Sequence, residues 1–201
     1  RLLGGLAIVK PFMFLTVPLV IEKIFKSKVF PQIRKFPAKY LMKVPLLDKL
    51  VLNKVRKALL NAFGNNFTVG VIIGGAALNR EVEDLLKRMK FPYVVGYGMT
   101  ECGPLISYRD KSEYVKYSCG TNAHPIEIRI DSANPRRVLG EIQVKGDNVM
   151  LGYYHNEQAT GEAFTDDGWF KTGDMGVIDA DGFLYIKGRC KTMILTGSGQ
   201  N

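Results

Sequence analysis

The stretch PYVVGYGMTECGP, residues 92–104, decides the fold because it joins a short apolar run to a glycine-rich turn. Residues 92–95 have the composition of a buried strand, and Gly96 ends that strand. In open α/β sheets, ligands lie at the carboxyl ends of the strands, where small residues let a ligand approach the backbone. The stretch therefore predicts a sheet with a ligand site after residue 95.

Three side chains that follow this strand suit a nucleotide: Tyr97, Thr100 and Glu101. An aromatic ring can stack on a base, and a Thr-Glu pair can hold a phosphate oxygen and its Mg²⁺. This ion prefers hard oxygen ligands, typically one or two carboxylates together with the phosphates of its nucleotide. A glycine-punctuated turn with a solvated glutamate fits the same residues, so this short motif leaves both interpretations open.

The residues upstream complete a β-α-β unit, which is typical of a parallel sheet. Residues 67–73 are expected to form a central strand that ends at the turn Gly74-Gly75-Ala76-Ala77. Asn79 is expected to cap a helix over residues 80–90. The core-facing stripe of that helix would be Val82, Leu85, Leu86 and Met89. The turn lacks G-x-G-x-x-G spacing, so no dinucleotide-binding Rossmann site is indicated.

The first third of the chain predicts short elements. Residues 5–17 favour one or two short buried strands, and Pro18 suits the first turn of a helix over residues 19–25. Residues 26–47 contain three prolines and favour short helices and turns. Asp48 is expected to cap a helix that runs to about residue 63. Its apolar stripe would be Leu50, Val51, Val55, Leu59 and Leu60.

From about residue 113 the pattern changes to short alternating strands at residues 126–130, 141–145 and 182–186. The predicted fold class is therefore α/β, with a parallel-sheet subdomain over residues 1–112. An antiparallel, β-rich, barrel-like subdomain would follow over residues 113–188. The sequence begins at Arg1 and ends at Asn201 without a polar tail, so we expect it to be part of a longer protein.

Composition narrows the function classes. Three cysteines, Cys102, Cys119 and Cys190, are odd in number and lack metal-type spacing, which favours reduced thiols in a cytoplasmic setting. The chain has only two histidines and no G-x-S-x-G elbow, so neither zinc nor a serine hydrolase is indicated. The apolar run over residues 11–21 is too short for a membrane span, which needs about twenty apolar residues.

Positive charge is concentrated in the first 60 residues, where thirteen Lys and Arg residues face two acidic ones, whereas the remainder has a net charge of −2. A solvated helix face is the commoner meaning of such charge. Zinc-finger spacing and an RNA-binding aromatic signature are absent, so no nucleic-acid partner is expected. The basic residues of 21–57 fit peripheral contact with an anionic membrane better.

Three separated blocks resemble the adenylate-forming acyl-CoA synthetases, the superfamily that includes luciferases and the adenylation domains of peptide synthetases. The blocks are Gly74-Gly75-Ala76, residues 97–101, and residues 169–174 with Gly188-Arg189-Cys190-Lys191. Residues 140–142 and 152–154 resemble the stretch that joins the second block to the third. Residues 9–25 and the closing T-G-S-G-Q-N, residues 196–201, are similar to the long-chain fatty acid branch.

This resemblance implies a partial acyl-CoA synthetase-like fold and an AMP-forming long-chain-fatty-acid–CoA ligase that uses ATP, Mg²⁺ and coenzyme A. It also implies roles for individual residues. Tyr97 would stack on adenine beside Gly98, and Gly75 and Ala76 would line the adenine and acyl pocket. Thr100 would contact the α-phosphate and Glu101 would hold Mg²⁺. Asp174, assisted by Arg189, would bind the ribose hydroxyls. Lys191 occupies the hinge position, where the family often has Asp, and residues 189–201 would begin a further domain.

The family's phosphate loop and its catalytic lysine would lie outside residues 1–201, so this chain alone is expected to be inactive. Two alternatives remain open. One is an adenylate-forming enzyme that takes aryl or amino acids. The other is a non-catalytic nucleotide- or acyl-binding module, because a fold does not fix a function.

Overall fold

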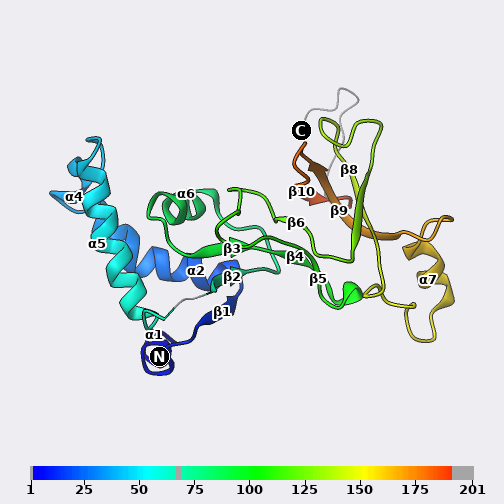
Figure 1. The fold of residues 1–201 in the computed structure, drawn as a ribbon, viewed down its shortest axis with the longest axis horizontal. Coiled ribbons are helices and arrows are strands. Elements are labelled where there is room, and N and C mark those ends of the chain that lie inside the picture. Colours follow the sequence, from blue (N-terminus) through cyan, green and yellow to red (C-terminus); the bar gives the residue numbers. More distant parts are fainter. Residues whose placement is uncertain (1, 67–68, 192–201) are drawn as a thin grey trace. The chain divides into compact units, whose positions relative to one another are not determined.

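The computed structural model describes residues 2–66 and 69–191, which form two compact units (Figure 1). The first unit comprises the chain up to Val95 together with Asp110–Ser112. The second comprises Gly96–Arg109 and the chain from Glu113 onward. The predicted domain boundary at residue 112 stays a prediction. The two compact units first divide after Val95.

The first unit contains a three-stranded parallel sheet in the order β1-β2-β3. Its strands are β1 (Met13–Thr16), β2 (Gly70–Ile73) and β3 (Tyr93–Val95). The predicted central strand and the predicted strand before Gly96 are therefore confirmed, and residues 67–68 of that prediction lie outside the described residues. The middle strand of this sheet, β2, forms part of the core, since its apolar residues Val71 and Ile73 are almost completely buried.

The helical elements of this unit are α1 (Leu2–Val9), α2 (Pro18–Ile24), the π-helical turn η1 (Phe25–Val29), α3 (Phe30–Arg34), α4 (Ala38–Leu41), α5 (Leu47–Ala62) and α6 (Arg80–Arg88). Helix α6 begins as predicted. The Asn79 side chain accepts hydrogen bonds from the backbone N–H groups of Glu81 (2.9 Å) and Val82 (3.3 Å). The four residues of its predicted stripe are all buried. Helix α2 also confirms the expected position of Pro18 in its first turn.

Two expectations for the first third are wrong. Residues 5–9 belong to α1, and the strand begins only at Met13, because a short apolar run does not distinguish a strand from a helix. Leu46, with a φ of 74°, precedes α5 in place of Asp48. Asp48 lies in the first turn, and its Oδ2 pairs with Arg88 of α6 at 3.1 Å.

The buried stripe of α5 also differs from the expected one. Leu52, Val55 and Leu59 are buried, whereas Leu50 is 66% exposed. Residues three and four apart share one face of a helix, so the stripe through positions 52, 55 and 59 leaves Leu50 on another face. Helix α5 therefore presents two apolar residues of its first turn, Leu47 and Leu50, to solvent.

The second unit contains two antiparallel sheets, in the orders β4-β5-β6 and β10-β9-β8-β7. Its elements are β4 (Tyr97–Gly98), the 3₁₀ turn η2 (Thr100–Cys102), β5 (Leu105–Tyr108), β6 (Thr121–Asn122), β7 (Glu127–Asp131), β8 (Gly140–Lys145), α7 (Glu157–Ala163), β9 (Phe170–Ile178) and β10 (Leu184–Arg189). The antiparallel prediction is confirmed. The barrel-like description is wrong for the described residues, because the larger sheet does not close: its end strands β7 and β10 do not pair with each other.

The larger sheet has a continuous apolar core. Ile142 and Val144 of β8 and Leu184 of β10 are completely buried, and Phe170 of β9 is 2% exposed. These residues alternate with polar ones along their strands, as expected where one face of a sheet is covered. Among the described residues, no helix combines the length and the apolar character that crossing a bilayer requires.

Candidate functional site

Strands β4, β9 and β10 bring together three of the predicted site residues within the second unit. The Tyr97 hydroxyl donates a hydrogen bond to Asp174 Oδ2 at 2.7 Å. Arg189 Nε lies 2.9 Å from Asp174 Oδ1. Asp174 is 6% exposed, and the Arg189 side chain is 65% exposed. A buried carboxylate is thus held between a neutral donor and a cation that reaches solvent.

The backbone around Asp174 is fixed by its neighbours in the sheet. Asp174 and Arg189 are opposite residues in the β9–β10 ladder. Gly173, with a φ of 72°, donates its N–H to Glu141 Oε1 at 3.0 Å and accepts from the Cys190 N–H at 2.9 Å. A side chain would strain that positive φ. Gly173 therefore permits the irregular pairing of β9 with β8 immediately before the carboxylate.

Tyr97 is itself buried, at 8% exposure. Burial is the largest cause that raises the pKa of its phenol well above the ordinary value, and the adjacent Asp174 raises it further. The hydroxyl is therefore a permanent donor to Asp174 at neutral pH. An ionised carboxylate offers about four acceptor positions. Asp174 consequently retains acceptor capacity for the hydroxyls of a ligand while Tyr97 and Arg189 hold it in place.

The position of Gly98 is set by close backbone contact. A Cβ on this residue would overlap the carbonyl oxygen of Pro104. Glycine therefore allows β4 and the start of β5 to approach each other, which places the turn η2 directly after Tyr97 and Gly98. Thr100, the first residue of that turn, is exposed to solvent.

Glu101 is half-buried and is held by a loop that precedes α7. The Tyr153 hydroxyl donates to Glu101 Oε1 at 3.1 Å, and the Met150 N–H donates to the Glu101 carbonyl oxygen at 2.7 Å. The loop is itself tied to α7, because the Tyr153 N–H donates to Thr160 Oγ1 at 2.9 Å. Burial, and then the contact with Glu101, raise the pKa of Tyr153, so this hydroxyl also remains a donor.

The donor set at Glu101 fits Mg²⁺. A carboxylate oxygen is a hard ligand, and Mg²⁺ commonly takes one or two of these together with phosphate oxygens and water. The described part of the chain contains no group of three or more His, Cys, Asp and Glu residues that could hold a metal by itself. Glu101 would therefore act as a single protein ligand to an ion that arrives with its phosphates.

The remaining predicted site residues lie elsewhere in the chain. Gly75 and Ala76 are exposed in the first unit, in the turn after β2, and Gly75 has a φ of 88°. Lys191 is exposed in a turn and is the last described residue. The predicted glycine loop over residues 196–201 lies outside the described residues. The structure thus brings Tyr97, Asp174 and Arg189 together and gives Glu101 a partner that sequence motifs did not indicate.

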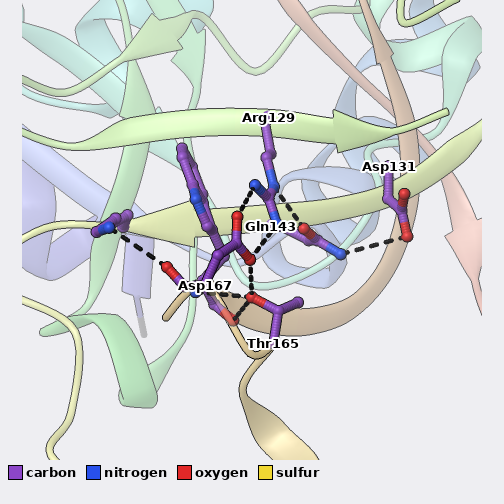
Figure 2. A network of polar contacts seen from close by, with 7 residues as sticks. Arg129, Asp131, Gln143, Thr165 and Asp167 are labelled. Atoms are coloured by element: carbon purple, nitrogen blue, oxygen red, sulfur yellow. Dashed lines mark hydrogen bonds and ion pairs between the residues drawn. The ribbon is translucent and has the colours of Figure 1, made fainter. Parts of the chain in front are cut away.

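A polar network fixes the turn that leads into β9 (Figure 2). Arg129 of β7 contacts Asp167 through both terminal nitrogens, at 2.5 and 2.9 Å, and its Nε donates to Gln143 of β8 at 2.6 Å. Its guanidinium carbon also lies 4.5 Å from the centre of the Trp169 ring. These contacts anchor the turn over residues 165–169 to the sheet, so the only Trp is a packed part of the strand entry.

Comparison with known proteins identifies similar sequences. A protein-family model described as AMP-binding enzyme matches residues 1–154. Long-chain-fatty-acid–CoA ligase FadD15 of Mycobacterium bovis is 35% identical, over all of this chain and 36% of its own length. The 2-succinylbenzoate–CoA ligase of Listeria innocua is 31% identical, over 99% of this chain and 40% of its own length.

A similar solved structure is that of a malonyl-CoA ligase with methylmalonyl-CoA and AMP bound. It is 27% identical, and its TM-score is 0.66 over 96% of this chain and 37% of the other. The chain therefore spans little more than a third of the length of the proteins that it matches.

Proposed function

Because the chain belongs to the adenylate-forming superfamily of AMP-binding enzymes, we propose that it is part of an AMP-forming long-chain-fatty-acid–CoA ligase. The match over residues 1–154 supports the AMP-forming chemistry. The 35% identity to a long-chain-fatty-acid–CoA ligase over the whole chain favours a fatty acid as the acyl substrate. An aryl substrate is the competing hypothesis, because a succinylbenzoate ligase is 31% identical over 99% of this chain and a probable 4-coumarate ligase is 38% identical over 76% of it.

The proposed reaction has two steps. An oxygen of the fatty acid carboxylate attacks the α-phosphorus of ATP, and the bond to pyrophosphate breaks to give an acyl adenylate. The sulfur of coenzyme A then attacks the acyl carbon, and AMP leaves. Charge neutralisation and positioning account for most of the catalysis in such phosphoryl chemistry. Residues 1–201 alone are expected to lack ligase activity.

We assign the contacts with the ribose and the phosphates to residues of the second unit. Asp174, held by Tyr97 and Arg189, would accept hydrogen bonds from the ribose hydroxyls. Glu101 would hold Mg²⁺, which neutralises the charge on the phosphates, and Thr100 would donate to the α-phosphate. Gly75 and Ala76 remain the proposed lining of the adenine and acyl pocket. The ring of Tyr97, beside Gly98, remains the proposed contact of adenine.

The acyl substrate can be identified with the full-length protein. Rates of coenzyme A thioester formation from hexadecanoate, 4-coumarate and 2-succinylbenzoate should be compared. We expect kcat/KM for hexadecanoate to exceed the others by about tenfold or more, because an apolar pocket discriminates by the methylenes that it buries. Preference for either aryl acid would assign the chain to another branch of the superfamily.

Tyr153 is expected to position the magnesium ligand. Tyr153→Phe removes the hydroxyl that donates to Glu101 Oε1 and keeps the ring. Loss of such a partner typically costs about tenfold in metal affinity. The Mg²⁺ concentration that gives half-maximal pyrophosphate exchange should therefore rise about tenfold, with the rate at saturating Mg²⁺ largely retained. The matched control is Tyr154→Phe, since Tyr154 is 91% exposed. Identical Mg²⁺ curves for both variants would remove Tyr153 from this role.

Lys191 is proposed as the hinge of the full-length enzyme. Hinges are a few residues at element ends that absorb large changes in φ and ψ. Proline would fix φ at about −65° and remove a backbone donor. Lys191→Pro should therefore spare adenylate formation and slow acyl transfer to coenzyme A, whereas Lys191→Ala should affect neither. The two half-reactions are measured by pyrophosphate exchange and by transfer from purified acyl-AMP. Equal loss in both would contradict the hinge role.

We also propose a cytoplasmic protein in peripheral contact with an anionic membrane through the basic residues of 21–57. Eleven Lys and Arg residues and two acidic ones occupy this segment. Each basic residue near an anionic bilayer contributes about 1 kcal/mol of attraction, which salt screens. Among the described residues, Cys102, Cys119 and Cys190 form no disulfide bond, which fits a reducing compartment.

A further inference from the structure

One surface of the first unit is rich in exposed apolar side chains. It consists of residues 35–50, which include α4 and the beginning of α5, and it is called the 35–50 surface below. Six large apolar residues in it are between 37% and 83% exposed: Phe36, Tyr40, Val44, Leu46, Leu47 and Leu50. Single exposed apolar side chains are common, but soluble proteins rarely expose contiguous apolar patches of more than roughly a few hundred Å², and such larger patches mark interaction sites.

These side chains belong to no core within the described residues. Helix α4 has no buried residue. Phe36 and Tyr40 contact each other edge to face, with ring centroids 6.0 Å apart, while both remain exposed. Helix α5 packs through Leu52, Val55 and Leu59, which leaves Leu50 on a solvent-facing side. Packing inside the first unit therefore does not account for the apolar character of this surface.

The same surface is positively charged. Its four lysines, Lys35, Lys39, Lys43 and Lys49, are all exposed. Its single carboxylate, Asp48, is 22% exposed and is neutralised by Arg88 at 3.1 Å. Lysines are therefore interspersed with apolar side chains on this surface. The only acidic residue of positions 35–50, Asp48, is already paired with Arg88.

We propose that the 35–50 surface inserts its apolar side chains into the interface of an anionic bilayer. The inference rests on the proposed membrane association and specifies which residues make it. Apolar side chains would enter the boundary between headgroups and acyl chains, and the lysine stems would extend to the lipid phosphates. Charge favours lipid over a second copy of this chain, because a symmetric contact would place two sets of four lysines together.

The test uses the full-length protein and sedimentation with two kinds of vesicle, phosphatidylcholine alone and phosphatidylcholine mixed with phosphatidylglycerol. Leu46→Ser/Leu50→Ser removes two of the proposed inserting side chains. Because burial of one leucine contributes roughly a tenfold change in partition or more, the variant should bind the anionic vesicles at least tenfold more weakly. Ile8→Ser/Val138→Ser is the matched control, since Ile8 is 83% and Val138 50% exposed outside the 35–50 surface. It should bind as the unchanged protein does.

Salt separates the two components of binding. Raising the salt from about 0.1 M to about 1 M shortens the screening length from about 10 Å to about 3 Å. The unchanged protein should retain a salt-resistant fraction on anionic vesicles, and the serine variant should lose that fraction. Thermal unfolding and gel filtration of each variant establish that it is folded and report its oligomeric state.

Each outcome has a distinct meaning. If the serine variant binds anionic vesicles as tightly as the unchanged protein, the 35–50 surface is not the contact, although the charge-based association stands. If the unchanged protein binds neither vesicle, the proposed membrane association is wrong, and if it binds both equally, the proposed role of the basic residues is wrong. If the serine substitutions instead convert a dimer to a monomer without affecting vesicle binding, a second copy covers this surface.

Discussion

Replacing Glu101 with glutamine in the full-length protein is expected to lower fatty-acid-dependent ATP–pyrophosphate exchange at least about hundredfold. Glutamine has nearly the same shape and can still accept the hydrogen bond from Tyr153, which lies 3.1 Å from Glu101 Oε1. It lacks the negative charge that binds Mg²⁺. The loss should therefore come from metal binding, and a large excess of Mg²⁺ should restore part of the activity.

Glu157→Gln is the matched control for this experiment. Glu157 is exposed in the first turn of α7, within the same unit, and has no proposed role in nucleotide binding. Its exchange rate and Mg²⁺ dependence should be unchanged. If Glu101→Gln exchanges pyrophosphate at the unchanged rate with the ordinary Mg²⁺ dependence, Glu101 is not the metal ligand.

The second large effect is expected at Asp174. Asp174→Asn keeps the size of the side chain and removes its charge, so one of the two donors, Tyr97 or Arg189, would face an amide N–H group in place of an acceptor. A buried polar group left without its partner typically costs 1–3 kcal/mol. We expect kcat/KM for ATP to fall about hundredfold, because the carboxylate that would accept the ribose hydroxyls is both altered and misplaced.

A nucleotide lacking one ribose hydroxyl distinguishes a binding role from a merely structural one. The unchanged protein should prefer ATP to 2′-deoxy-ATP, and Asp174→Asn should reduce that preference. Tyr97→Phe keeps the ring but removes the hydroxyl that holds Asp174, and it should reduce the preference by a smaller amount. Asp181→Asn, at an exposed turn of the same unit, is the control. An undiminished preference in Asp174→Asn would exclude Asp174 from ribose binding.

Local patterns in the sequence predicted much of this fold. The helical period placed the buried side chains of α6, and the capping preference of asparagine located its first residue at Arg80. The alternation of residues 126–130 and 141–145 predicted β7 and β8. These features follow from the fixed side-chain periods of helices and strands, which are visible in a single sequence.

The misplaced elements depend on distant contacts. Asp48 matches the residue type of a helix cap, but its carboxylate pairs with Arg88, which is forty residues away. Glu101 and Tyr153 are separated by fifty-two residues, and their hydrogen bond depends on where the loop before α7 lies. No periodic pattern reports a contact of this kind. The motif predicted that Glu101 is functional, and only the structure indicates which group orients it.

The most direct test of the proposed function is to identify the nucleotide product of the full-length protein. The protein is incubated with ATP, Mg²⁺, hexadecanoate and coenzyme A, and the nucleotides and thioester are separated by chromatography. The proposed function predicts AMP and pyrophosphate in amounts equal to the acyl-CoA formed, with neither appearing when the fatty acid is omitted. Formation of ADP and phosphate, or binding of ATP without any product that depends on a carboxylic acid, would contradict it.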